Sequence, residues 1–148
     1  DTVKAVLSTL GSVDFIKTAM QPGMPQGCGS VTVDSRTVPI ITLPGNPVSS
    51  YVSFGNFVRP AIRTMLGADT IQRPDRMATI TEGMQSPGAK RQYARGHLDR
   101  AAGTVTPVGG QGSHVVGGLA QANCMIVINE GVSLVAAGDS VRVIECGE

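Results

Sequence analysis

The stretch LPGNPVSS at residues 43–50 constrains the fold of this chain more than any other part of its sequence. It follows the apolar run Val38–Thr42, which predicts a strand, and it precedes a segment with helical spacing. Asn46 is a favourable N-cap residue, and Pro47 suits the first turn of a helix. Two prolines with fixed φ angles therefore predict a stiff corner between a strand and a helix.

The helix predicted from Pro47 runs to about Leu66, where Gly67 ends it, and Pro60 inside it predicts a kink. Pro39 lies in the strand that precedes this helix, and it predicts that the strand is at a sheet edge or that Pro39 is near its beginning. The elements predicted ahead of this corner are a helix Thr2–Leu10 with Val3, Val6, Leu7 and Leu10 on one face, a strand Val13–Met20, a loop Gln21–Ser30, and strands Val31–Asp34 and Thr37–Leu43.

The pattern changes after Gly67, where residues 68–75 read as a linker. Short β segments with glycine-rich turns follow, and their close spacing predicts a small barrel or sandwich. These segments are Met77–Glu82, Arg91–Asp99, Thr104–Val108, Cys124–Asn129 and Ser140–Glu145. We therefore expect an α/β unit at residues 1–70, followed by an all-β unit at residues 71–148.

Composition excludes some functions. A net charge of +1 gives no broad electrostatic reason to expect nucleic acid or membrane partners, and no apolar run has the length of a membrane span. Three cysteines without a C-x-x-C pair favour a reduced, cytosolic setting. The first residue is not Met, so we expect an internal piece of a longer protein.

Several motifs together resemble the C-terminal part of molybdopterin molybdenumtransferase, the family of bacterial MoeA and the E domain of gephyrin. They are the start Asp1–Lys4, PGMP at 22–25, LPGNPVSS at 43–50, FVRP at 57–60, RG at 95–96, QGSH at 111–114 and ANCMIVI at 122–128. The resemblance implies the second half of a MogA-like three-layer α/β domain joined to a small β-barrel or sandwich. It also implies insertion of molybdate into adenylylated molybdopterin with release of AMP, a Mg²⁺ requirement, a cytoplasmic location and a homodimer. We expect the piece alone to be inactive. The sequence does not distinguish molybdate from tungstate.

The corner at residues 44–49 is the first candidate site. An open helix N-terminus attracts anions through its free N–H groups, and Gly45 allows a ligand to approach the backbone. Asn46 lies at that end of the helix, and Ser49 adds a hydroxyl to the first turn. The resemblance assigns Pro44 and Pro47 to the molybdate or pterin pocket. The alternative is an ordinary strand–helix connection.

The resemblance also implies that Asp1 serves metal and substrate chemistry and that Lys17 lies close to molybdate. A carboxylate suits Mg²⁺, and an ammonium group neutralises an oxyanion. The alternatives are a helix cap for Asp1 and a solvated strand face for Lys17.

The loop Gln21–Pro25 is a further candidate, with Pro22, Gly23 and Pro25 as its fixed points. It departs from the family's commoner K-P-G-K-P pattern, because Gln21 and Met24 replace two lysines. The oxyanion would then depend more on Lys17 and on backbone amides. The alternative for this loop is a surface turn.

Other residues are interpreted as structural. Ser113 and His114 are adjacent and have no evident acidic partner, so QGSH is read as a turn motif rather than a catalytic pair. Arg91, Arg95 and Arg100 form a basic stripe that is read as a solvated strand face.

The alternative function is a gephyrin-type scaffold that binds a partner peptide, with HVVGGLAQ and EGVSLVAAGD as the segments that could form its groove.

Overall fold

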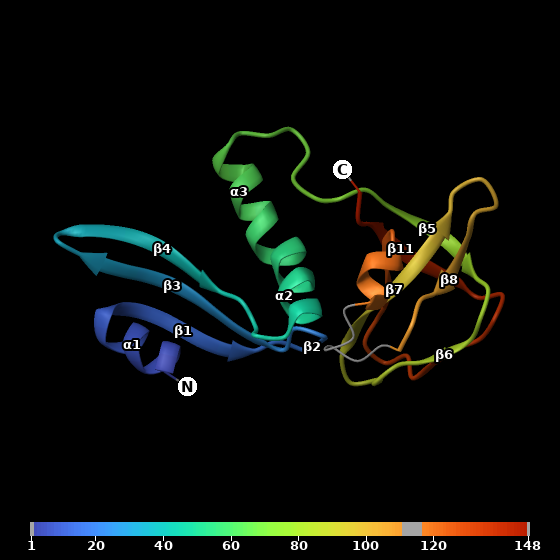
Figure 1. Cartoon of the computed structure of the whole chain (residues 1–148), viewed down its shortest axis with the longest axis horizontal. Coiled ribbons are helices and arrows are strands. Elements are labelled where there is room, and N and C mark those ends of the chain that lie inside the picture. The colour runs from blue at the N-terminus through green and yellow to red at the C-terminus, as the bar shows by residue number, and fades with distance from the viewer. Residues whose placement is uncertain (1, 111–116, 148) are drawn as a thin grey trace.

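The computed structural model of the chain describes residues 2–110 and 117–147. Figure 1 shows an elongated molecule with a small sheet at one end, a β-barrel at the other and a long helical segment between them. The helices and strands before the barrel are α1 (Thr2–Leu10), β1 (Gly11–Lys17), β2 (Met20–Gln21), β3 (Pro25–Val33), β4 (Arg36–Thr42), α2 (Pro47–Ser53), a π-helical turn η1 (Phe54–Val58) and α3 (Arg59–Met65). The order of an α/β unit followed by an all-β unit agrees with the prediction.

The first sheet has the strand order β1-β3-β4, and both of its pairings are antiparallel. The hairpin between β3 and β4 turns at Asp34 and Ser35, which have φ angles of 48° and 67°. Both central residues lie in the left-handed region, as a two-residue hairpin turn requires. Pro39 lies opposite Ser30 in β4, at the sheet edge, as predicted.

The predicted loop Gln21–Ser30 is wrong in its second half, because β3 begins at Pro25. The glycines that suggested a loop allow close packing of strands instead. A Cβ added to Gly27 would lie 2.4 Å from Thr42 Oγ1, and one added to Gly29 would lie 2.0 Å from the Ser12 carbonyl oxygen. Glycine in a strand can mark such a close approach rather than a turn.

The helical segment from Pro47 to Met65 contains the disturbance that Pro60 predicts. Its middle turn is the π-helix η1, in which the N–H of Arg59 donates to the carbonyl of Phe54. The widened turn lies directly before Pro60, which cannot donate a backbone hydrogen bond. Gly67 has a φ of 65° and follows the end of α3, as expected for a helix-terminating glycine.

The second half of the chain is a closed barrel. Its strands are β5 (Asp75–Ile80), β7 (Arg91–Asp99), β8 (Thr104–Pro107), β9 (Cys124–Ile128) and β11 (Ser140–Glu145). They pair in the order β7-β8-β5-β11-β9, and β9 returns to pair with β7. The short strands β6 (Met84–Gln85) and β10 (Leu134–Val135) and the helix α4 (Gly117–Gln121) were not predicted.

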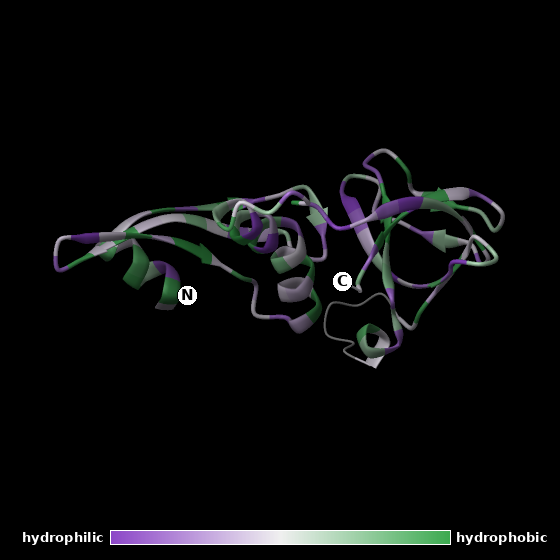
Figure 2. Ribbon diagram, turned by 90° about the horizontal axis from the view of Figure 1, so that it is seen from above, coloured by the Kyte–Doolittle hydropathy of each residue, from purple (hydrophilic) through white to green (hydrophobic). Residues whose placement is uncertain are grey.

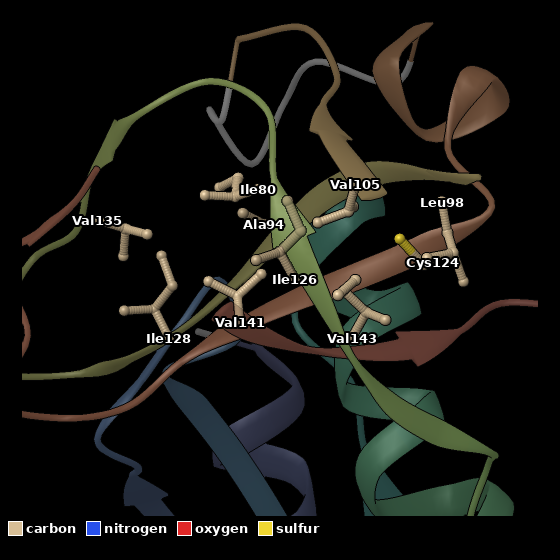
Figure 3. Packing of buried hydrophobic residues seen from close by; sticks show 11 residues of the cluster. Ile80, Ala94, Leu98, Val105, Cys124, Ile126, Ile128, Val135, Val141 and Val143 are labelled. Atoms are coloured by element: carbon tan, nitrogen blue, oxygen red, sulfur yellow. The ribbon is translucent and has the colours of Figure 1, made fainter. Parts of the chain in front are cut away.

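One apolar cluster fills the barrel (Figure 3). Ile80, Val105, Cys124, Ile126 and Val143 have no exposed surface. These inward positions alternate along β5 and β11, whereas β9 is buried at all of its residues. The alternation explains why the strands could be found from the sequence.

A second, smaller cluster joins the two halves of the molecule. It contains Met20 of β2, Val52 of α2 and Met125 of β9, with Tyr51 and Tyr93 packed against it. In addition, β2 pairs in parallel with β7, so that Met20 lies opposite Arg91. The barrel is therefore hydrogen-bonded to the chain segment that precedes β3.

The apolar face predicted for α1 is mostly uncovered. Leu7 is buried, but Val3, Val6 and Leu10 are each about half exposed. Figure 2 shows α1 as a largely hydrophobic element beneath the first sheet. None of the helices in the described part of the chain combines the length and apolar character needed to cross a membrane.

Candidate functional site

The strand register brings the predicted site residues to one end of the first sheet. Lys17, the last residue of β1, pairs with Pro25, the first residue of β3. Thr42, the last residue of β4, pairs with Gly27. The segment 18–24 and the corner 43–46 therefore leave the sheet at the same end. Figure 1 shows the start of α2 beside β2 in this region.

The segment 18–24 is held in a defined conformation. The Thr18 N–H donates to the Met24 carbonyl at 2.8 Å, and the Thr18 hydroxyl donates to the same oxygen at 3.0 Å. The peptide bond between Gln21 and Pro22 is cis. These contacts hold the loop in one conformation, whether it serves as part of a site or as a surface turn.

Gln26 ties this loop to the helix. Its Nε2 donates to the Gly23 carbonyl at 2.5 Å and to Ser53 Oγ of α2 at 2.7 Å. Gly23 has a φ of 96°, and a Cβ added there would lie 2.8 Å from Ser53 Oγ. Gly23 is thus required both by its backbone conformation and by its contact with α2. Gln26, Gly23 and Ser53 are all buried.

The corner before α2 has extended backbone at Asn46, with φ −74° and ψ 131°, and the helix begins at Pro47. The Asn46 side chain does not form the predicted capping hydrogen bond. The Ser50 hydroxyl instead reaches back and donates to the Pro44 carbonyl, and the Ser50 N–H donates to the Asn46 carbonyl at 2.9 Å. A Cβ added to Gly45 would meet open space, so a ligand could approach the backbone at this point.

The predicted site residues fall into two groups by burial. Lys17, Pro25, Gly45, Asn46 and Pro47 are exposed, and Pro44 is partly buried. Pro22, Gly23 and Ser49 are buried, so they can shape the site only from beneath its surface. Asp1 and the QGSH motif at 111–114 lie outside the described residues.

A magnesium site needs several oxygen ligands placed around one point. Among residues 2–110 and 117–147, no group of three His, Cys, Asp or Glu side chains is placed to hold a metal ion. The described residues therefore do not fit a complete metal site, and we derive no reaction step through a metal.

Arg95 of β7 was predicted on a solvated strand face, but it is buried. Its Nη2 donates to the Gly110 carbonyl, and a Cβ added to Gly118 would lie 3.1 Å from its Nε. Burial lowers the pKa of the Arg95 guanidinium from its ordinary value. Arg91 and Arg100, in contrast, form ion pairs with Glu130 and Glu145. The only local signal for the buried arginine is the small Gly96 next to it.

Two family models match the chain, and together they cover most of it. Residues 1–64 match a probable molybdopterin binding domain, and residues 77–146 match the MoeA C-terminal region, domain IV. The fold and the sequence thus define an α/β unit that resembles a probable molybdopterin binding domain, followed by a MoeA-type barrel.

Curated relatives agree with these matches. The chain is 49% identical over 131 residues to molybdopterin molybdenumtransferase 2 of Mycobacterium tuberculosis, covering 88% of the chain and 31% of the relative. It is 32% identical over 147 residues to molybdopterin molybdenumtransferase of Haemophilus influenzae, covering 97% of the chain and 35% of the relative. The chain thus spans about a third of the length of these relatives.

A solved structure shares the fold. The molybdopterin biosynthesis MoeA protein of Pyrococcus horikoshii is 26% identical with a TM-score of 0.79, covering 98% of this chain and 34% of that one. In sequence and fold, the chain corresponds to the C-terminal portion of the molybdopterin molybdenumtransferases that it matches.

Proposed function

We propose that this chain supplies part of the substrate site of an enzyme that inserts molybdate into adenylylated molybdopterin and releases AMP. The observation that carries the proposal is the convergence of Lys17, the loop Gln21–Pro25 and the corner Pro44–Pro47 at one end of the first sheet. The names of the matched relatives support the same reaction.

Electrostatics favours an oxyanion at this place. The Lys17 ammonium is exposed there, and the N-terminal end of a helix follows the corner. Pro44 and Pro47 restrict the backbone, which lowers the entropy lost when a ligand binds. Lys17 would balance the charge of molybdate, and the N–H groups at the helix end would donate to its oxygens.

A second lysine compensates for the charge missing from the loop. The Lys90 Nζ lies 3.6 Å from the Sδ of Met24, which stands where the family more often has a lysine. A thioether is a weak acceptor and does not neutralise an ammonium group. Lys90 is partly buried and comes from the barrel, so both halves of the molecule contribute positive charge to this region.

The remaining parts of the proposal follow the family. Asp1 would serve Mg²⁺ and substrate chemistry, the location would be cytoplasmic, and the division at residue 70 would separate two domains. A homodimer is supported by exposed apolar side chains on α1 and by Met65 and Leu66, which are 79% and 77% exposed. Sedimentation analysis of the chain and of a Met65→Glu, Leu66→Glu variant tests the dimer, which the variant should weaken.

A chimaera tests the proposed reaction. This chain would replace the corresponding third of the Mycobacterium tuberculosis relative, and AMP release from adenylylated molybdopterin with molybdate would be measured. We expect the chimaera to be active and the chain alone to be inactive. An inactive chimaera with a native circular dichroism spectrum, or activity of the chain alone, would contradict the proposal.

The peptide-binding alternative is not favoured, because the matched relatives are named as transferases. Part of the segment EGVSLVAAGD, including the exposed Leu134, does line a surface cavity with Met77 and Val127. This cavity alone does not identify a partner.

A further inference from the structure

Three arginines line one cavity on the side of the molecule formed by α3, the linker and the C-terminal residues. They are Arg59 and Arg63 of α3 and Arg73 of the linker, and Thr70, Gln72, Pro74 and Cys146 complete the lining. None of these residues belongs to the predicted molybdate site.

Each guanidinium is held through one nitrogen and keeps its other N–H groups. Arg59 Nη1 donates to the Ile71 carbonyl at 2.9 Å, and Arg63 Nε donates to the Thr70 carbonyl. Arg73 Nη1 donates to the Cys146 carbonyl at 2.7 Å and to the Gly147 carbonyl at 3.2 Å. A guanidinium carries five N–H donors, so the cluster has donors left for a ligand.

Among residues 2–110 and 117–147, no carboxylate forms an ion pair with Arg59, Arg63 or Arg73. The ion pairs found among the described residues use Arg76, Arg91, Arg100 and Arg142. The pKa of Arg59 is lowered, first by burial and then by repulsion from Arg73 and Arg63. Arg59 and Arg63 are also four residues apart on one helix, where like charges destabilise each other. A bound anion would relieve this repulsion.

A second cavity, of about 220 Å³, adjoins the first and shares Gln72, Arg73 and Cys146 with it. Aromatic and apolar side chains, namely Tyr51, Tyr93, Met125 and Ile144, line much of it. Its acidic residue, Asp75, is paired with Arg142. Burial, followed by a hydrogen bond with Cys146, raises the pKa of Tyr51 to about 12, so its phenol adds no negative charge at neutral pH.

We propose that the two cavities form a binding site for a phosphate ester that carries a flat ring. The arginine cluster binds the phosphate group through forked N–H donors, which match the geometry of phosphate oxygens. The ring enters the tyrosine-lined cavity, where aromatic side chains provide apolar contact. This site is separate from Lys17 and the corner Pro44–Pro47.

Calorimetric titration of the chain with inorganic phosphate, phenyl phosphate and phenol tests the proposal. We expect phenyl phosphate to bind more tightly than phosphate or phenol. Arg59→Gln and Arg63→Gln should each weaken phenyl phosphate binding by about tenfold or more, because each removes a charged hydrogen-bond donor. Arg36→Gln, at the exposed tip of the β3–β4 hairpin, removes the same charge and should leave the affinity unchanged.

Other outcomes would overturn the inference. If Arg59→Gln and Arg63→Gln lower the melting temperature but not the affinity, the arginines only attach the linker to α3. If Lys17→Gln alone abolishes binding, the ligand occupies the proposed molybdate site, and that proposal survives while this one fails. Equal affinities for phosphate and phenyl phosphate would show that the ring does not bind in the tyrosine-lined cavity. Arg59→Lys, which keeps the charge, should retain part of the affinity if a glutamine variant does not fold.

Discussion

Gln26 Nε2 donates to Ser53 Oγ at 2.7 Å, and this hydrogen bond joins the start of β3 to α2 across 27 residues of sequence. Both side chains are buried. The same nitrogen also donates to the Gly23 carbonyl, so a single amide group fixes the loop against the helix. The position of the candidate site therefore depends on a polar contact in the interior.

Replacing Ser53 with alanine should remove this contact and leave the Gln26 amide with one acceptor fewer. We expect the free energy of unfolding to fall by about 1–2 kcal/mol, the usual cost of breaking a buried hydrogen bond. Urea denaturation monitored by circular dichroism measures the change. Ser12→Ala, at an exposed position in β1, is the matched control, and equal losses in the two variants would contradict the expectation.

Replacing Gly23 with alanine should destabilise the chain more than replacing Gly67 with alanine. Both glycines have positive φ angles, 96° and 65°, so backbone strain should lower the free energy of unfolding of each variant by about 1 kcal/mol. Only Gly23 also lacks space, because its added Cβ would lie 2.8 Å from Ser53 Oγ, whereas Gly67 has nothing within 4 Å. Thermal unfolding of the two variants compares them directly. Equal melting temperatures would show that the loop can move away from α2.

Stability should fall as the pH rises above about 9, because burial raises the pKa of Cys124 from 9.0 to about 12. The unfolded thiol loses its proton near its ordinary pKa, while the folded thiol keeps it, so the unfolded state gains stability as the pH rises towards 12. The folded-state pKa of Tyr51 is also raised to about 12 and acts in the same direction.

The melting temperature between pH 8 and pH 11 measures this effect. Cys124→Ala should be less stable at pH 8, because it leaves a cavity in the barrel, and should lose less stability at higher pH. Cys28→Ala, at an exposed position, should keep the dependence of the parent chain. A Cys124→Ala curve parallel to that of the parent would contradict the assignment.

Lys17→Gln and Lys90→Gln should each weaken molybdate binding to the chain. Each removes one positive charge near the loop Gln21–Pro25, and loss of a hydrogen bond to a charged group would lower the affinity by about tenfold. Calorimetric titration with molybdate measures the affinity. Lys4→Gln is the control, because Lys4 lies on α1 with its Nζ 5.6 Å from the centre of the Phe15 ring. If only Lys17→Gln weakens binding, Lys90 does not belong to the site.

The barrel could be predicted well because β5 and β11 alternate between the core and the surface and β9 is a short continuous apolar run. Arg91–Asp99 and Ser140–Glu145 were predicted with their observed bounds. The two-residue strands β6 and β10 were missed, because such short segments carry no periodic signal. Gly27 and Gly29 suggested a loop where β3 runs. They allow the neighbouring strands to approach closely, and a local sequence pattern does not show which strands are neighbours.

The candidate site could be predicted only in its parts. Pro44–Pro47 has a local signature. Its closeness to Gln21–Pro25, however, depends on where β3 begins, and the sequence predicted that strand to begin later than it does. The burial of Arg95 could not be foreseen for a related reason. An arginine in a strand is usually solvated, but Arg95 is enclosed by Gly118 and donates to the Gly110 carbonyl, and both glycines are distant in sequence.

The pairing of β2 with β7 has a mechanical consequence. Gln21 lies opposite Gln92 on the barrel, and Gly23, two residues further along the chain, packs closely against Ser53 of α2. A rotation of the barrel about the linker would therefore pull on this short strand and shift the loop with it. The loop is thus attached to the barrel on one side and to α2 on the other, so the spacing between the barrel and the helix bears on the shape of the candidate site.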